Sequence, residues 1–271
     1  TKNKSFGFLG KYRRDFEPMR ARLIVGLDVD YSPGSRDEDS VLLDGGNVTN
    51  PLGGKTYRLS TTVAPKQIYD YDVTYRGISP YIHGEASLTD KLRLNAGLRY
   101  DDMQYDYENK FNNGVAEATQ GAAGAFPGNG WYGHVASTKV GYSHWGPKLG
   151  ATYAFSDTLN GFAAYSNSFR TPSEGQVFRG SRQNTKALAQ AAAESLLNLK
   201  PVIVDNYELG LRGKSGTLRY EASVYHMIKK DDIVSYRDPV TDQRIVVNAG
   251  ETQHRGIELG LGLPLAQDWQ L

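Results

Sequence analysis

The 271-residue sequence contains no cysteine, which excludes disulfide bonds and is compatible with a route through the oxidising periplasm. It also lacks an excess of charge of either sign, because 31 basic and 30 acidic residues give a formal net charge of +1. A nucleic-acid partner would require a basic surface, so none is expected. No apolar run approaches the roughly 18 residues of a transmembrane helix, and the mean hydropathy is −0.52.

What the sequence does contain is long alternation of apolar and polar residues. Residues 92–100 show it best, and residues 205–263 repeat it in three strands, of which the first two meet at Lys214-Ser215-Gly216. A period of two predicts β-strands with one apolar and one polar face. Such segments exceed the roughly 5–6 residues of a soluble strand and suit the roughly 9–11 residues of a tilted membrane strand. We therefore expect an all-β fold, an antiparallel transmembrane β-barrel with a wet interior.

The connections between these strands alternate between short turns and long loops. Short turns are predicted at Asp15, Asp90, Asp157 and Ser215, and long loops at residues 33–66, 108–137, 171–201 and 237–244. In outer-membrane barrels the short turns lie in the periplasm and the long loops lie outside. The spacing accommodates about nine strands.

Two local patterns lead to further predictions. The apolar positions change parity within residues 69–88, which predicts a β-bulge near Arg76-Gly77. Residues 186–199 have helical spacing, and Pro201 would end that helix. The apolar face predicted for the helix comprises Leu188, Ala191, Ala192, Ser195, Leu196 and Leu199.

Four short motifs resemble those of one protein family. In chain order they are Pro147-Lys148-Leu149-Gly150, Phe169-Arg170-Thr171-Pro172-Ser173, Asp205-Asn206-Tyr207-Glu208-Leu209-Gly210, and Asn248-Ala249-Gly250 with His254-Arg255-Gly256-Ile257-Glu258. Their identities and their order resemble the TonB-dependent outer-membrane receptors, over about residues 147–258. The N-terminal half repeats the strand pattern with less specific motifs, such as Gly97-Leu98-Arg99-Tyr100.

The resemblance implies a place within a 22-stranded barrel whose lumen is closed by a plug. We interpret residues 1–271 as an internal fragment of that barrel domain, because the sequence begins at Thr1 without a signal peptide. The plug domain and its TonB-contacting segment have no counterpart in it. The resemblance further implies a location in the bacterial outer membrane, in contact with its lipid. It also implies uptake of a ferric siderophore or similar iron chelate, energised by the TonB–ExbB–ExbD complex through the plug.

Alternative functions remain open at this point. A passive outer-membrane porin would share the strand pattern but would lack the family motifs. A receptor of the same family could instead take up cobalamin, haem, a metal or a sugar. A soluble β-sandwich binding module would accommodate such long strands poorly and would purify without detergent.

Candidate ligand-binding residues are the arginines and aromatic residues of the predicted loops and strand ends. Arginine can hold a carboxylate through two hydrogen bonds, and aromatic rings can cover a planar ligand. These candidates are Arg170, Arg179, Arg182, Trp131, Tyr132, Tyr105 and Tyr236. The simpler interpretation of Tyr105, Tyr107 and Tyr236 is an outer aromatic girdle.

Charged residues on the polar parity are predicted to face the lumen. The principal ones are Arg93, Arg99, Lys148, Glu208, Arg212 and Glu258. They could hold a plug or pass an anionic ligand, or they could simply form cross-strand ion pairs that keep the interior wet. Catalysis has little support, since Ser143 and His144 are strand neighbours that point to opposite faces. The five histidines show no metal-ligand spacing, so no metal site, cofactor or enzymatic activity is expected.

Overall fold

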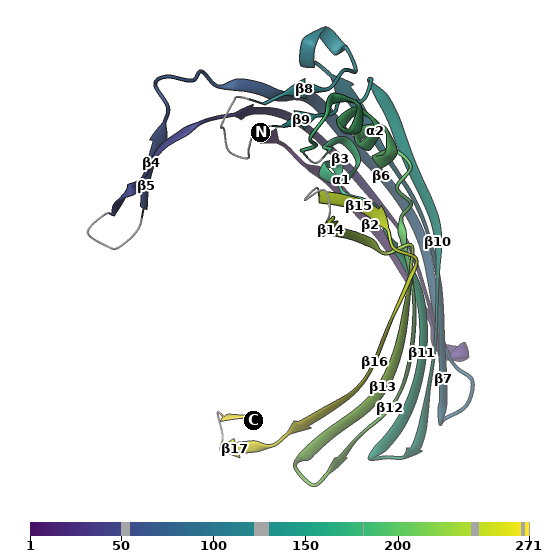
Figure 1. Ribbon diagram of the computed structural model, residues 1–271. Helices are drawn as coiled ribbons and strands as arrows, with labels where there is room; N and C mark the ends of the chain where they lie inside the picture. Colours follow the sequence, from purple (N-terminus) through teal and green to yellow (C-terminus); the bar gives the residue numbers. More distant parts are fainter. Residues whose placement is uncertain (50–54, 122–129, 181, 240–243, 267–268, 271) are drawn as a thin grey trace.

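The computed structural model describes residues 1–49, 55–121, 130–180, 182–239, 244–266 and 269–270. Its main feature is one antiparallel sheet in which each strand pairs with the strands next to it along the chain. Figure 1 shows this sheet bent into an open arc, with helix α1 inside the arc. The arrangement confirms the all-β prediction and is that of a partial barrel wall.

Nine strand positions form the wall, because β1 and β2 both pair with β3 along the same edge. The strands, in spatial order, are β1 (Lys2–Asn3) with β2 (Phe6–Phe16), β3 (Ala21–Ser40), β6 (Lys66–Ser87), β7 (Leu92–Asn109), β10 (Thr138–Ser156), β11 (Leu159–Arg170), β12 (Val202–Ser215), β13 (Leu218–Lys230) and β16 (Glu251–Gly262). Most exceed the length of ordinary soluble strands, as the alternation predicts.

The strand register separates an apolar face from a polar face. One row of directly paired residues crosses all nine strand positions and contains only apolar side chains. It runs Phe16, Ala21, Ala86, Leu94, Ala151, Ala163, Leu209, Val224 and Ile257. The adjacent row on the other face contains Asp15, Arg22, Glu85, Asn95 and Glu208. Helix α1 (Glu174–Phe178) packs on this second face, so the polar face is the concave one (Figure 1).

Aromatic and large apolar residues border the convex apolar face at both ends. Towards the loops, Tyr100 lies beside Trp145 with ring centroids 4.7 Å apart, and Tyr165 lies beside Tyr207 at 5.0 Å. Towards the short turns, Tyr153 and Phe155 are in edge contact. Such girdles mark the two interfaces of a membrane-spanning band. None of the helices in the described residues is long and apolar enough to cross a membrane.

The prediction of a β-bulge near Arg76-Gly77 is wrong. The β3–β6 register continues unbroken from Asp28↔Ser79 to Glu38↔Tyr69 and shifts only between Glu38 and Asp39. The apolar parity changes for another reason. Tyr69, Tyr71, Val73 and Tyr75 remain on the concave face, where folded loops cover them in place of water.

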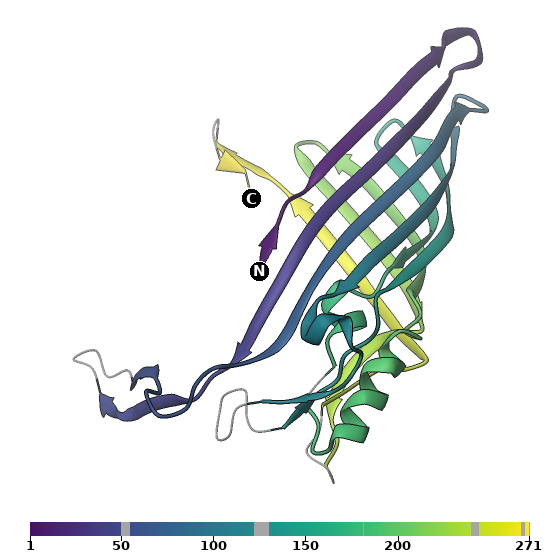
Figure 2. The same cartoon turned by 90° about the horizontal axis from the view of Figure 1, so that it is seen from above.

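The long loops contain more regular structure than expected. Strand β3 continues to Ser40, and hairpin β4 (Leu43–Thr49) with β5 (Lys55–Leu59) projects away from the sheet (Figure 2). The second loop contains a 3-10 helix and two short strands, and the fourth carries hairpin β14–β15. These elements are η2 (Phe111–Gly114), β8 (Thr119–Gln120), β9 (Trp131–Tyr132), β14 (Ile233–Arg237) and β15 (Arg244–Asn248). Much of the low-complexity segment at residues 121–125 lies outside the described residues.

Helix α2 (Lys186–Leu196) confirms the helical spacing in the third loop, but of the predicted apolar face only Leu196 and Leu199 are buried. The buried residues are Ala189, Ala193 and Leu196, while Leu188 is 49% exposed. The helix ends three residues before Leu199, in a turn. Spacing alone did not reveal that the helix docks through its small alanines.

The alternating connections lead to a test of topology. Cysteine at exposed Leu188 should react on intact cells with a membrane-impermeant maleimide in the full-length receptor, because long loops face outside. Cysteine at Asp90, in a short turn, should react only after the outer membrane is permeabilised. Labelling of intact cells at Asp90 but not at Leu188 would invert the topology.

Candidate functional site at the loop end of the sheet

Tyrosines of the concave face form an aromatic cluster at the loop end of the sheet. Tyr71 and Tyr107 are almost fully buried, with ring centroids 5.1 Å apart. Phe178 of α1 stacks on Tyr107 at 4.3 Å and 12°. Strand alternation brings these side chains to one face, and α1 covers them. The third loop therefore folds inward over the concave face of the wall.

Hydrogen bonds from three tyrosine hydroxyls hold this loop in place. Tyr105 donates to the carbonyl oxygen of Pro172 at 3.1 Å, and Tyr69 donates to that of Gly180 at 2.8 Å. Tyr71 donates to the carboxylate of Glu174. Because the donors are buried, losing an acceptor would leave an unsatisfied hydroxyl at a cost of roughly 1–3 kcal/mol. These bonds fix where α1 lies.

A charged group lies at the edge of the aromatic cluster. The Arg36 guanidinium donates to Glu38 at 2.7 Å, and the Arg179 guanidinium lies 3.8 Å from the same carboxylate. Arg36 and Glu38 come from β3, whereas Arg179 follows α1. The carboxylate thus joins the wall to the third loop. Glu174 is the second acid near this group.

Helix α2 packs closely against the segment that follows β9. A Cβ atom placed on Gly133 would lie 2.0 Å from the carbonyl oxygen of Ala189 and 2.7 Å from the Cβ of Ala193. Glycine is required here because the helix backbone occupies the space of a side chain. The Gln190 side chain also donates to the carbonyl oxygen of His134 at 2.8 Å.

Substitution of Gly133 by valine should displace α2. The clash is with helix backbone, which cannot move alone, and overpacking of this kind costs roughly 1–3 kcal/mol. Amide hydrogen exchange in α2 of the full-length receptor should accelerate in the variant. Gly216→Val is a suitable control for added bulk, since no atom lies within 4 Å of its Cβ position, although its φ of +60° adds local strain. Unchanged exchange in α2 of Gly133→Val would contradict this packing.

His134 is buried beside α2 without a hydrogen-bonding partner for its ring. It is 1% exposed, and among the described residues neither ring nitrogen has an acceptor or donor. Its ring stacks on Phe111 at 4.2 Å and 6°, with the Tyr69 ring 5.3 Å away. Burial lowers the pKa of His134 to about 4, since the charged imidazolium would lose its hydration.

An aromatic and basic group lies at the outer rim of the loop cluster. Trp131 exchanges two backbone hydrogen bonds with Gln183, of 2.8 and 2.9 Å. The Lys186 ammonium lies 6.0 Å from the Trp131 ring centroid, and the Arg182 side chain packs against Gly130. We name Trp131, Arg182 and Lys186 the rim group. It combines the Trp131 ring with the Arg182 guanidinium and with the Lys186 ammonium, which is paired with Glu117. Planar and cationic surface of this kind suits an anionic ligand with planar parts.

The structure divides the candidate ligand residues into two sets. Tyr105 and Tyr132 are 8% and 4% exposed, so they belong to the packed cluster and not to the outer surface. The girdle interpretation of Tyr105 and Tyr107 is wrong, because both face the concave side. Exposed Arg170 and Tyr236 lie on β11 and β14, apart from the rim group.

The six predicted lumen residues all lie on the concave face in the register. Arg93 and Glu258 belong to a single row across the sheet. Arg99 bonds Asp28 at 2.5 Å and Asp101 at 2.7 Å. Lys148, Glu208 and Arg212 occupy rows of the same face. Neighbouring opposite charges support the ion-pair interpretation of this surface.

The sequence analysis did not identify several residues that organise the site. Asn248 of the Asn-Ala-Gly motif hydrogen-bonds both the backbone nitrogen and the carbonyl oxygen of Lys200, at 2.9 and 3.0 Å, and donates to the carbonyl oxygen of Asp231 at 2.7 Å. It thus joins hairpin β14–β15 to the end of the third loop. The sequence did not reveal that Glu38 contacts Arg179 or that Glu174 contacts Tyr71, since the members of each pair are distant in sequence. The described residues contain no cluster of acids and histidines suited to a metal.

Comparison with known proteins agrees with this architecture. The profile of the family "TonB dependent receptor-like, beta-barrel" matches residues 2–271. The copper transporter OprC superimposes with a TM-score of 0.69 at 14% identity, covering 99% of this chain and 36% of that one. The ferric-catecholate import receptor Fiu from E. coli K12 has a TM-score of 0.60 at 14% identity, covering 99% and 36%.

The ferric citrate transporter FecA in the unliganded form gives a TM-score of 0.58 at 16% identity, covering 97% of this chain and 32% of that one. The chain thus spans about a third of the length of these structures. Receptors of this kind are transport proteins of the bacterial outer membrane and not enzymes. On its strand pattern, its open barrel wall and this match, the chain belongs to the TonB-dependent receptor β-barrel family.

Proposed function

We propose that this chain is part of the wall and outer mouth of a receptor that takes up a ferric siderophore or similar iron chelate. The ligand binds at the loop end, a plug fills the lumen, and the TonB–ExbB–ExbD complex moves that plug to admit the ligand. Residues 1–271 belong to the barrel domain in this scheme. The iron-uptake receptors Fiu and FecA, which share this fold, support it at the level of class.

The observation that carries the proposal is the inward fold of the third loop. It places α1 on the concave face and brings Gln183 to Trp131 of the second loop, so in this proposal a ligand from outside meets the rim group before the lumen. Iron chelates of the siderophore class present carboxylate or phenolate oxygens around the metal, which arginine and lysine hold well. Below the mouth, paired charges on the concave face provide a hydrated wall for a plug.

We assign the residues that contact the ligand by how exposed each candidate side chain is. Arg182 and Trp131 of the rim group are the first ligand contacts, with exposed Arg170 and Tyr236 as further contacts. Arg179 holds the third loop through Glu38 and supports the mouth from below. Tyr105 and Tyr132 act through packing.

Uptake in whole cells tests the class. A strain without its own receptors, carrying the full-length receptor, should accumulate radioactive iron from a panel of ferric chelates. Accumulation should stop when TonB is deleted or a protonophore is added. Uptake that continues without TonB would instead establish a passive porin. Uptake of haem, copper or cobalamin alone would assign that ligand to the receptor in place of a ferric chelate.

Substitutions at the rim test the contact surface. Arg182→Gln should raise the chelate concentration for half-maximal uptake about tenfold or more, because hydrogen bonds to charged groups contribute roughly 1.5–3 kcal/mol. Lys200→Gln, at an exposed position past α2, is the matched control and should leave uptake unchanged. Equal effects of the two substitutions would remove the rim group from the ligand site.

A further inference from the structure

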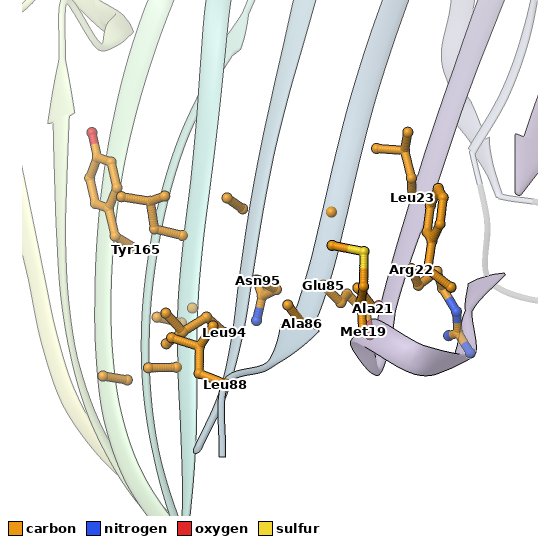
Figure 3. Close-up of a pocket in the computed structure, with 18 residues that line it drawn as sticks. Met19, Ala21, Arg22, Leu23, Glu85, Ala86, Leu88, Leu94, Asn95 and Tyr165 are labelled. Atoms are coloured by element: carbon orange, nitrogen blue, oxygen red, sulfur yellow. The ribbon is translucent and has the colours of Figure 1, made fainter. Parts of the chain in front are cut away.

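The convex face contains a groove that the ligand pathway does not use. Its volume is about 880 Å³, and it crosses β3, β6, β7, β10 and β11 near the short turns. Figure 3 shows Leu23 and Met19 on one side and Leu88, Leu94 and Tyr165 on the other, with Ala86 between them. The lining is apolar apart from Tyr165 and from Arg22, Glu85 and Asn95, which occupy concave positions of the register.

The groove arises from side-chain size along two neighbouring rows of the register. In the middle of the wall the convex positions carry Gly84, Ala86, Ala96, Ala151 and Ala163. Larger side chains bound them on both sides, so the surface is hollow where other parts of the band are full. A methylene chain in such a hollow is contacted on three sides, and each pair of atoms in contact adds dispersion energy.

Cationic side chains lie at the turn end of the groove. Arg14 pairs with groove residue Leu23 in the register, and its guanidinium lies 5.1 Å from the ring centroid of Phe16, which also lines the groove. Arg20 follows groove residue Met19 and bonds Asp90 at 2.5 Å, and Lys91 is exposed in the neighbouring turn. Around these two turns and the adjoining end of β2 the exposed acids are Asp15, Glu17 and Asp90, and the exposed cations are Arg13, Arg14, Arg20 and Lys91, so the cations outnumber the acids by one.

We propose that this groove binds one acyl chain of an anionic phospholipid in the periplasmic leaflet, with the phosphate held by Arg14 and Arg20. Apolar burial cannot select this lipid, because the surrounding hydrocarbon is equally apolar. Selection comes from shape and charge. A basic side chain near a membrane surface attracts anionic lipid by about 1 kcal/mol. Two arginines together therefore give a preference of roughly tenfold or more for an anionic over a neutral lipid.

Native mass spectrometry of the full-length receptor tests the proposal. After detergent washing, the receptor should retain phosphatidylglycerol in preference to phosphatidylcholine supplied at the same concentration. The double variant Ala96→Leu, Ala163→Phe fills the groove and should lose the retained lipid. Val25→Phe adds a ring to the same convex face outside the groove and should retain it. Arg14→Gln with Arg20→Gln should bind both lipids equally.

The outcomes separate the possible occupants. Equal lipid retention by the filled and control variants would overturn the groove as a lipid site. A receptor dimer that disappears in the filled variant would make the groove an interface between copies. If the filled variant fails to fold, Leu149→Trp replaces it, because brominated phosphatidylglycerol should quench this groove residue more strongly than Leu261→Trp on β16. Equal quenching would again exclude a bound lipid.

Discussion

Arginine in place of Leu94 should lower the free energy of unfolding of the refolded full-length receptor by up to about 2–4 kcal/mol, the cost of arginine at the bilayer midplane. Leu94 lies on the convex face in a row of nine apolar residues, between the two girdles of the band. A guanidinium there must leave water for hydrocarbon or distort the bilayer to reach it. Equilibrium unfolding in lipid vesicles with increasing urea measures the difference.

The control for this substitution is its neighbour in β7. Asn95 lies on the concave face, so Asn95→Arg keeps its charge in contact with water and should cost much less. Gly210 is unsuitable for the same purpose, because a Cβ atom there would lie 2.8 Å from the carbonyl oxygen of Ala222. A loss of stability for Asn95→Arg as large as that for Leu94→Arg would show that the faces are assigned incorrectly.

Acidification should loosen the loop cluster through His134. In the unfolded loop its pKa is about 6.5, whereas in the folded loop it is about 4. Below pH 6.5 the unfolded form therefore binds a proton that the folded form does not bind. The free energy of unfolding of the loop cluster falls as the pH drops towards 4. A difference of this size corresponds to roughly 3 kcal/mol at its full extent.

Hydrogen exchange of α2 in the full-length receptor, corrected for intrinsic rates, measures this effect. Protection should decline between pH 6.5 and 5, above the range where most carboxylates titrate. His134→Phe should remove that decline, since phenylalanine can stack on Phe111 and no ring hydrogen bond is lost. His254→Phe, at an exposed position of β16, should keep it. A decline that persists in His134→Phe would assign it to other groups.

The strand pattern was readable because the membrane imposes a simple rule. Within the membrane band the convex positions must be apolar, so the orientation of Leu92, Leu94 and Leu98 could be predicted from the alternation. The same reasoning failed for Tyr69 to Tyr75. Their parity changed because a loop distant in sequence covers the concave face, and period two cannot distinguish lipid from protein as the apolar partner.

The candidate site was only partly predictable for a similar reason. Arg182 and Trp131 could be selected as loop residues of suitable chemistry, but their proximity depends on the bridge between Trp131 and Gln183. Tyr105 and Tyr132 have the same chemistry and are buried. Exposure is a property of the packed loops, so composition could not separate these two pairs.

The sequence by itself determined the membrane β-barrel class, about nine strands and the faces of those strands within the membrane band, because strand periodicity and bilayer thickness are local constraints that each strand satisfies alone. Only the tertiary structure decided how the third loop covers the concave face, where His134 is buried, and where the convex groove lies. These features depend on contacts between residues far apart in the chain, such as Phe178 with Tyr107 and Ala189 with Gly133. Such contacts leave no period in the sequence.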